Sequence, residues 1–332
     1  MPTPPLRYLS ADAVAACLPP ATERVELAAS ALLALARDDA EMPPKIGVHP
    51  RPGALLHAMP AWLRGADLVG MKWVSAFPDN RSRGLPAIGG LIVLNDPDTG
   101  LPTWVLDAGV ITAHRTAAVS GVAIRLFSPA RVQRVGLVGA GVQARSHLEL
   151  IAELLPGATV LLHDVHRERA SALAVELGSQ RGLAVNVVDS AQAAIGAADV
   201  VVTAATLRKE GGFIDPDGLA LGALVIAIDF ASCVRGTVAT AARHFVTDDR
   251  AQYLAYRTSG YFDGYPDVVE TLGETLDQRG LTGPVEADGR PTGADERPVL
   301  VSHLGVGLAD VVFANAVAKG AERTGFGLEL PR

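Results

Sequence analysis

The glycine-rich segment in the middle of the chain has residue types and spacing suited to binding a dinucleotide. An apolar run at 135–138 leads into Gly139-Ala140-Gly141-Val142-Gln143-Ala144, and a helical pattern follows directly. Gly139 permits a tight turn, Gly141 lets a pyrophosphate approach the backbone, and Ala144 is small enough for close packing of helix on strand. The N–H groups at the start of such a helix would face the phosphates, with Val142 and Gln143 among the contacts. A dinucleotide site is therefore predicted, with a glycine turn that serves only packing as the alternative.

An acid follows at the end of the next apolar run, 159–163. There Asp164 would accept hydrogen bonds from the ribose hydroxyls of the adenosine moiety. A carboxylate at this point repels the 2′-phosphate of NADP, so NAD is the expected cofactor. His166 and Arg167 leave NADP open, because a guanidinium can pair with that phosphate.

Three cations lie in apolar or β-rich stretches of the N-terminal region, namely Lys45, Lys72 and Arg115. A buried cation such as Lys72 is costly without a partner, and Arg115 is expected in the first turn of a helix, where the dipole disfavours it. Such placements need an anion, and a substrate carboxylate suits the guanidinium fork. The alternative is that each cation pairs with an internal Asp or Glu.

A candidate proton-transfer group ends the apolar run 224–228. Ligands of an open α/β sheet bind outside the carboxyl ends of its strands, so Asp229 would lie beside a nicotinamide. Apolar surroundings would raise its pKa and suit it to acid–base work, although it could instead cap the following segment. Asp310 is expected to be a first-turn helix acid rather than a catalyst, and Cys233 a small buried hydrophobe.

Smaller roles are expected for the remaining polar residues. Thr203, which ends an expected strand at 199–203, and Thr112 are further candidates for contacts with the cofactor. Three histidines show no metal-ligand spacing: His57, His114 and His303. No metal is expected, and only His303 is kept as a site candidate.

The elements that must position these residues follow from the hydrophobic pattern. Residues 22–38 predict an amphipathic helix, and a second helix is expected to begin with Thr112 as its cap and to run to Phe127. Short β-rich runs lie between them, at 53–59, 68–74, 89–94 and 102–107. The turn cluster Asn95-Asp96-Pro97-Asp98-Thr99-Gly100 joins the last two runs as a hairpin. A final helix at 308–323 would pack back on this region.

The rest of the chain alternates between strand and helix patterns. Strands are predicted at 135–138, 159–163, 184–188, 199–203, 224–228 and 244–247. This alternation predicts an α/β fold, with a Rossmann-type doubly wound parallel sheet plus a discontinuous α+β domain for substrate binding and dimerisation. The expected boundaries are 1–127 with 303–332 for the α+β domain and 128–302 for the NAD(P)-binding domain. Residues 275–298 are expected to form exposed loops.

Length and composition narrow the class of protein further. The chain has 332 residues, enough for two ordinary domains, and its net charge of -7 argues against a nucleic-acid partner. Its two cysteines make neither a disulfide framework nor a zinc site. No signal peptide is apparent at Met1-Pro2-Thr3-Pro4-Pro5, and the longest apolar run, 219–228, is too short to span a bilayer. A cytoplasmic protein without membrane partners is expected.

Several motifs outside the nucleotide fold carry a resemblance to a known family. They are His57-Ala58-Met59-Pro60, Gly70-Met71-Lys72 with Pro78-Asp79-Asn80, Leu94-Asn95-Asp96 with Thr99-Gly100-Leu101-Pro102, Thr112 with Arg115-Thr116-Ala117-Ala118, and Gly305 to Asp310. Together with Gly139 to Ala144 they run in the order of the ornithine cyclodeaminase/mu-crystallin family, over roughly residues 40 to 325. The resemblance implies a homodimer with an NAD(P) domain beside a substrate-binding and dimerising domain.

The resemblance also implies roles for individual residues. Lys45, Lys72 and Arg115 would hold the α-carboxylate of a small amino acid or imine, and Lys72 and Asp229 are the candidate catalytic residues. In a cyclodeaminase of this type, hydride passes from Cα to NAD, the distal amine attacks the imine, ammonia leaves and hydride returns. Other members are alanine dehydrogenases or cyclic ketimine reductases, in which net oxidation or reduction occurs.

Two departures from the family pattern bear on the substrate. Lys45 stands where the cyclodeaminases carry Arg, and Ile228-Asp229-Phe230-Ala231-Ser232 lacks the usual Gly-Ser before the acid and the Pro after it. The sequence therefore predicts an NAD-dependent enzyme of ornithine cyclodeaminase type and leaves its substrate side chain open. The alternatives are an NAD(P)H-dependent ketimine reductase or alanine-dehydrogenase-like enzyme, and a non-catalytic NAD(P)-binding protein similar to mu-crystallin.

Overall fold

The computed structural model describes residues 5–209, 211–281 and 295–331. Residues 1–4, where no signal peptide is expected, and 282–294, within the expected loop region, lie outside this description. The chain divides into two compact units, Met1–Arg115 with Gly305–Arg332 (unit 1) and Thr116–Leu304 (unit 2). The first division thus falls between Arg115 and Thr116, inside a helix, and not after residue 127 as the sequence pattern suggests.

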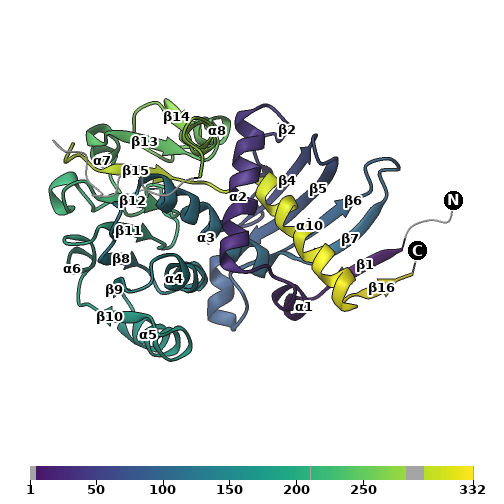
Figure 1. Cartoon of the computed structure of the whole chain (residues 1–332), viewed down its shortest axis with the longest axis horizontal. Helices are drawn as coiled ribbons and strands as arrows, with labels where there is room; N and C mark the ends of the chain where they lie inside the picture. The colour runs from purple at the N-terminus through teal and green to yellow at the C-terminus, as the bar shows by residue number, and fades with distance from the viewer. Residues whose placement is uncertain (1–4, 210, 282–294, 332) are drawn as a thin grey trace. The chain divides into compact units, whose positions relative to one another are not determined.

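Unit 2 contains an eight-stranded sheet in which every neighbouring pair of strands is parallel. The order is β10-β9-β8-β11-β12-β15-β13-β14 (Figure 1). The strands are β8 Arg134–Val138, β9 Thr159–His163, β10 Ala184–Val187, β11 Val200–Thr203, β12 Leu224–Ala227, β13 His244–Thr247, β14 Glu270–Thr271 and β15 Val299–Ser302. Chain order reverses between β8 and β11, which creates the switch point of a doubly wound fold. The predicted Rossmann-type sheet is confirmed.

Helices connect these strands and cover the sheet. They are α4 Val142–Leu154, α5 Arg167–Arg181, α6 Ala191–Ile195, the 3-10 turn η2 Pro216–Gly218, α7 Gly236–Ala241, α8 Arg250–Thr258 and α9 Leu272–Arg279. All six predicted strands are present, but the short strands β14 and β15 are missing from the prediction. All four residues of β15 are buried, and it lies between β12 and β13, inside the sheet.

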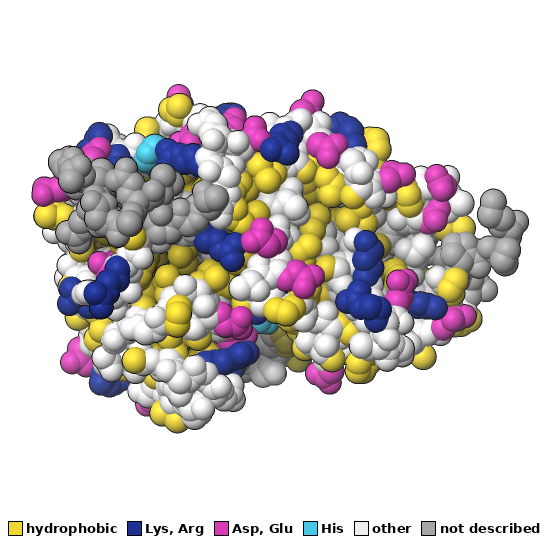
Figure 2. All heavy atoms as spheres, in the orientation of Figure 1, with side chains coloured by type: hydrophobic (Ala, Val, Ile, Leu, Met, Phe, Trp, Pro, Cys, Tyr) yellow, Lys and Arg dark blue, Asp and Glu magenta, His cyan; other side chains and the backbone are white. Residues whose placement is uncertain are grey.

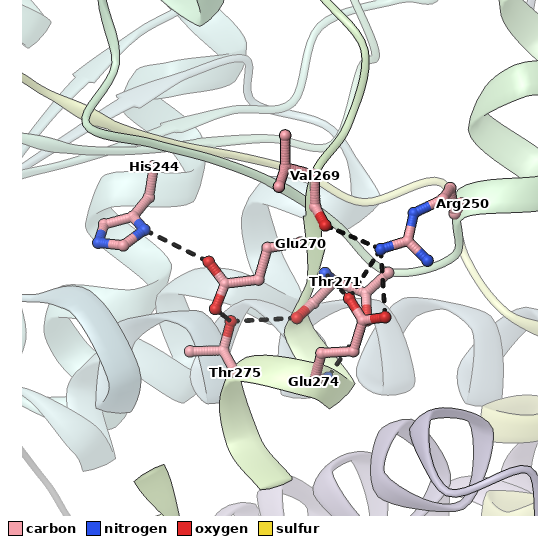
Figure 3. Close-up of polar contacts among 7 residues, drawn as sticks. All are labelled: His244, Arg250, Val269, Glu270, Thr271, Glu274 and Thr275. Atoms are coloured by element: carbon pink, nitrogen blue, oxygen red, sulfur yellow. Dashed lines mark hydrogen bonds and ion pairs between the residues drawn. The ribbon is translucent and has the colours of Figure 1, made fainter. Parts of the chain in front are cut away.

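Helix α9 corrects the expectation that the loops begin at residue 275. Thr271 caps it, because the Glu274 N–H donates to the Thr271 hydroxyl at 3.2 Å and the Thr271 N–H donates to the Glu274 carboxylate at 2.7 Å. Arg250, at the start of α8, bonds the same carboxylate at 2.9 Å (Figure 3). This reciprocal capping box satisfies N–H groups that a helix start otherwise leaves unpaired.

Unit 1 contains a second sheet, in the order β16-β1-β7-β6-β5-β4-β2, with β3 paired to β4. The strands are β1 Leu6–Leu9, β2 Ala40–Glu41, β3 Ile46–Val48, β4 Leu55–Leu63, β5 Leu68–Ala76, β6 Ile88–Asn95, β7 Pro102–Asp107 and β16 Leu328–Leu330. The predicted hairpin is confirmed as the antiparallel pair of β6 and β7. The helices are α1 Ala11–Ala16, α2 Ala21–Ala36, the 3-10 turn η1 Pro78–Arg83 and α10 Gly307–Thr324. Figure 1 shows α10 beside α2, and it packs on β4, β5 and β6.

Helix α3, Ala108–Phe127, begins four residues before the predicted cap. The Asp107 carboxylate accepts the Gly109 N–H at 2.8 Å, so Asp107 and not Thr112 caps the start. The expectation that Arg115 lies in the first turn is therefore wrong. Its unfavourable setting is caused by burial, since only 5% of Arg115 is exposed.

The surface and the helices limit the partners. On the face in Figure 2, Lys and Arg side chains alternate with Asp and Glu, without a large patch of one sign among the described residues. None of the helices in the described ranges combines the length and apolar character needed to cross a bilayer.

Candidate functional site

The turn after β8 requires glycine at its first position. Gly139 has φ +109°, and a Cβ on it would lie 2.5 Å from the carbonyl oxygen of Ala204. Its N–H donates to the carbonyl of His163 at 2.7 Å, which holds the turn against the end of β9. Any other residue here would force β8 away from the loop after β11.

The start of α4 is arranged as an anion-binding site. Gly141 is its N-cap, no side chain caps the helix, and a Cβ on Gly141 would meet nothing within 4 Å. Val142 is 70% exposed while Ala144 is fully buried against the sheet. The side-chain oxygen of Gln143 is a buried acceptor without a hydrogen-bond partner in the described part of the chain. Uncapped N–H groups in front of open space fit a pyrophosphate.

Asp164 follows β9 and holds the glycine loop from the other side. Its carboxylate accepts the Ala140 N–H at 2.7 Å and the His166 N–H at 2.8 Å. Each carboxylate oxygen has a second lone pair, so the ribose hydroxyls of a dinucleotide fit this group. The guanidinium of Arg167 forms an ion pair with Asp189. This carboxylate would compete with the 2′-phosphate of NADP for the guanidinium.

Asp229 lies two residues after the end of β12 and is 2% exposed. Its carboxylate accepts the Thr203 hydroxyl at 2.7 Å and the Ala205 N–H at 2.9 Å. Burial raises its pKa, against the opposing effect of these hydrogen bonds. The carboxylate thus holds the loop after β11, and it also accepts a hydrogen bond from the Cys233 thiol in the segment that follows. Cys233 is buried as expected, and burial together with Asp229 raises the pKa of its thiol.

Phe230, directly after this acid, has a backbone conformation that sequence reasoning missed. Its φ is +60°, which side chains with a Cβ rarely adopt. The ring packs against Tyr256, Tyr261 and Phe262 with centroids 4.8 to 5.6 Å apart. Strained residues concentrate at functional sites, where the surroundings hold them in place. The aromatic cluster therefore fixes the backbone on which Asp229 stands.

In unit 1, two of the predicted cations converge on one carboxylate. The Nζ of Lys72 lies 2.7 Å from Asp310 Oδ2, and the Nε of Arg115 donates to Asp310 Oδ1 at 2.9 Å. Lys72 and Asp310 are 1% and 0% exposed. The Thr112 hydroxyl lies 3.5 Å from the same Nζ, so Thr112 belongs to this group in unit 1.

The electrostatics of this group favour a further anion. Burial, the charge of Arg115 and that of Lys45 lower the pKa of Lys72 to about 7, although Asp310 opposes them. Burial disfavours ionisation of Asp310, but Arg115 and Lys72 hold its pKa below the ordinary value. A carboxylate ligand would offset the excess of cations over this single acid.

Gly305, before α10, makes room for the guanidinium. Its φ is +87°, and a Cβ would lie 2.5 Å from a terminal nitrogen of Arg115. His57 and Met59 are two residues apart on β4, so they lie on the same side of the sheet. Lys72 is the cross-strand partner of Met59 and therefore lies on that side too. Burial and the charges of Lys45, His49 and Lys72 lower the pKa of His57 to about 4.

The predicted site residues therefore form two groups, one in each unit. Unit 2 holds the glycine loop with Asp164, Thr203 and Asp229, while unit 1 holds Lys45, Lys72, Arg115 and Thr112. The alternative of internal pairing is correct for Lys72 and Arg115, which share one acid. The roles of Asp310 and Gly305 were not predicted, although both lie in a motif that the family resemblance includes.

Comparisons with known proteins identify relatives over almost the whole chain. The nodulation efficiency protein NfeD of Rhizobium meliloti is 36% identical, over 97% of this chain and 98% of that protein. An alanine dehydrogenase of Archaeoglobus fulgidus is 32% identical, over 84% of this chain and 86% of that enzyme. An archaeal alanine dehydrogenase, solved as a dimer with bound NAD, has 28% identity and a TM-score of 0.83, over 98% of this chain and 99% of that one. The sequence profile of the ornithine cyclodeaminase/mu-crystallin family matches residues 18–237, and the chain belongs to this family.

Proposed function

We propose that the protein is an NAD-dependent oxidoreductase that interconverts a small α-amino acid and its α-imino acid, linear or cyclic. The observation that carries this proposal is the burial of Lys72 and Arg115 around the single carboxylate of Asp310. Such a group is suited to bind an α-carboxylate. Similarity to an alanine dehydrogenase over most of the chain supports the redox reaction. The nicotinamide of the cofactor, when bound, supplies the hydride acceptor or donor.

Each polar residue of unit 1 has a distinct role in this proposal. Arg115 and Lys45 hold the substrate carboxylate by charge, and Asp310 keeps Arg115 and Lys72 in place. Lys72 transfers the proton, because a pKa of about 7 lets its Nζ accept or donate one near neutral pH. In the oxidative direction, neutral Nζ takes a proton from the substrate ammonium; in the reductive direction, protonated Nζ returns it to the imine nitrogen.

The residues of unit 2 would hold the cofactor. The first turn of α4 binds the pyrophosphate, and Asp164 binds the adenosine ribose, for which it already has a fixed orientation. The ion pair of Arg167 with Asp189 favours NAD over NADP, because it competes with a 2′-phosphate for the guanidinium.

A substrate panel tests this function. Purified protein is incubated with NADH or NADPH and pyruvate plus ammonia, or cyclic imines, and absorbance at the nicotinamide band is followed. Net oxidation of NADH with at least one of these substrates is expected. Nucleotide binding without turnover of any substrate would favour the non-catalytic binding protein instead.

Cyclodeamination is a second candidate function, and Asp229 is the observation that favours it. An acid with a raised pKa at the carboxyl end of β12 suits proton exchange with a distal amine. Ornithine and other diamino acids with NAD would then release ammonia and a cyclic product with no net change in NADH.

The variant Asp229→Asn separates the two candidates. Asn fits the same hydrogen bonds, because its oxygen can accept the Ala205 N–H and its amide can donate to the Thr203 hydroxyl. Loss of a proton-transfer group lowers turnover by about 10² to 10⁴-fold, which is expected for cyclodeamination. An oxidoreductase that relies on Lys72 should keep its activity within about tenfold of wild type. Cofactor affinity, measured by NADH fluorescence, serves as the control for correct folding.

A homodimer is the expected assembly, and one face of the sheet in unit 1 suits its interface. Cross-strand pairing places Ile46, Ala58, Trp73 and Leu91 in one row. Ile46, Trp73 and Leu91 are 68%, 40% and 41% exposed. Contiguous exposed apolar side chains of this kind mark interaction surfaces. A second copy of the chain is the proposed occupant, because the archaeal relative was solved as a dimer.

Trp73→Glu is expected to dissociate this dimer. A charge in the apolar centre of an interface costs about 2 kcal/mol or more, which weakens association at least about thirtyfold. Sedimentation velocity across a dilution series measures this change. Val175→Glu, which alters an exposed apolar residue of α5, should leave the oligomeric state unchanged. A Trp73→Glu protein that sediments like wild type would place the interface elsewhere.

A further inference from the structure

Three polar side chains of unit 2 form a hydrogen-bonded chain that the proposed reaction does not use. Ser120 lies on α3, His147 on α4, and His303 directly after β15. They are 0%, 1% and 2% exposed. The Ser120 hydroxyl lies 2.8 Å from the Nε2 of His147 and 2.8 Å from the Nε2 of His303.

The direction of each hydrogen bond follows from the group at one end of this hydrogen-bonded chain, the backbone carbonyl of Gln143. The Nδ1 of His147 lies 2.7 Å from the carbonyl oxygen of Gln143, which can only accept. This Nδ1 therefore carries a proton, and a neutral His147 has an unprotonated Nε2. Burial lowers the pKa of His147 to about 4, so the ring is neutral at pH 7. Its Nε2 must then accept the Ser120 hydroxyl proton.

His303 is assigned by the same reasoning. A serine hydroxyl has one proton, and in this chain that proton goes to His147. The second contact of Ser120 must therefore be a bond that its oxygen accepts, donated by the Nε2–H of His303. The bonds thus run in one direction, from His303 through Ser120 and His147 to the backbone carbonyl of Gln143.

The end point of the chain links it to the nucleotide loop. Gln143 belongs to the first turn of α4, next to its N-cap Gly141, which has open space around its Cα and no side-chain cap. A buried donor or acceptor without its partner is costly. The hydrogen bonds among these residues can therefore all form in only one placement of this turn relative to α3 and β15. Three apolar side chains of similar size would fill the space without this directional constraint.

We propose that Ser120, His147 and His303 are positioning residues that hold the first turn of α4 in the geometry that binds the dinucleotide pyrophosphate. This inference rests on the proposed nucleotide binding and adds residues outside the glycine motif to it. The three residues act through the Gln143 carbonyl and the helix start.

The variant Ser120→Ala tests the proposal, with Thr275→Ala as its matched control. The Thr275 hydroxyl is also fully buried in unit 2, where it donates to Glu270 at 2.6 Å (Figure 3). Both variants lose hydrogen bonds of a buried hydroxyl, so both should lose thermal stability. Only Ser120→Ala should weaken NADH binding, by about five- to tenfold in Kd measured by fluorescence. At saturating cofactor its kcat should stay within about twofold, because the chemical step is not altered.

A second measurement uses the wild-type protein and does not depend on how the variant folds. Two-bond ¹H–¹⁵N spectra of protein with ¹⁵N-labelled histidine at pH 7 distinguish the two ring nitrogens, with assignments from single histidine variants. His147 is expected to be protonated at Nδ1 and His303 at Nε2. The opposite tautomer at either ring would overturn the proposed direction of these hydrogen bonds.

The outcomes of the binding experiment are distinct. An NADH Kd for Ser120→Ala equal to that of Thr275→Ala would overturn the positioning role while leaving the proposed function intact. Wild-type protein that binds neither NADH nor NADPH would remove the proposed function and the positioning role with it.

Discussion

Asp310→Asn is expected to lower the free energy of unfolding by about 3–5 kcal/mol, the cost of leaving buried charges unpaired. The substitution keeps the shape of the side chain but removes the single carboxylate that Lys72 and Arg115 share. All three side chains are buried, so water compensates only in part for the lost carboxylate. Urea denaturation followed by circular dichroism measures the loss.

The control for this prediction is an exposed pair. Arg235 and Asp215 form an ion pair with 52% and 34% of their side chains exposed, and Asp215→Asn should cost less than about 1 kcal/mol. Equal losses for the two variants would mean that Asp310 contributes no more than a surface acid.

The pH dependence of unfolding checks the same group. The pKa of Asp310 in the folded protein is below the ordinary value of 3.8. Its ionisation therefore stabilises the fold fully above that value, and this stabilisation is lost as the pH falls through the lower, folded pKa. Asp310→Asn should remove this part of the acid sensitivity and leave that of the other carboxylates.

The parallel sheet could be predicted from the sequence because its strands are buried on both faces and appear as continuous apolar runs. β15 was missed, because its run Val299–Ser302 directly follows the segment 275–298 that composition assigns to exposed loops. Its position between β12 and β13 depends on long-range pairing, to which local composition gives no access. Helix α9 could have been found, because Thr271 and Glu274 have the spacing of a capping box.

The two groups of site residues also differ in whether local sequence or long-range contacts define them. The nucleotide loop is contiguous, so turn chemistry and one acid after the next strand were enough to predict it. The cation group depends on Asp310, which lies 195 residues from Arg115 in sequence. A first-turn acid in an apolar helix has the same sequence pattern whether it faces water or two buried cations. The partner of Lys72 and Arg115 was therefore visible only in the fold.

At Asp229, after β12, the sequence predicted the acid but not the backbone conformation of the residue that follows it. Its place after an apolar strand predicted an Asp229 whose apolar surroundings raise its pKa. The side chain is buried in the structure, and this burial is the cause that raises the pKa. The positive φ of Phe230 could not be predicted, because Phe is a poor residue for that conformation. The aromatic cluster that holds it is assembled from α8 and the loop that follows α8.

Lys72→Met is expected to lower kcat/KM by about 10² to 10⁴-fold, the range for loss of a general acid–base group. Methionine has nearly the same length and is suited to a buried position, and Asp310 keeps its bond to Arg115. The fold should therefore persist, which separates this variant from Asp310→Asn. Lys319→Met, which removes an exposed lysine of α10, should keep full activity.

The pH profile decides whether Lys72 transfers the proton or only holds charge. Its pKa is lowered to about 7, so it is protonated below pH 7 and neutral above it. Reduction of an imine needs the protonated form, and its kcat/KM should fall as pH rises through about 7. Oxidation needs the neutral form, and its kcat/KM should rise over the same interval. Both steps should be absent from Lys72→Met, while steps caused by substrate ionisation remain. A variant that loses activity but keeps both steps would show that another group moves the proton.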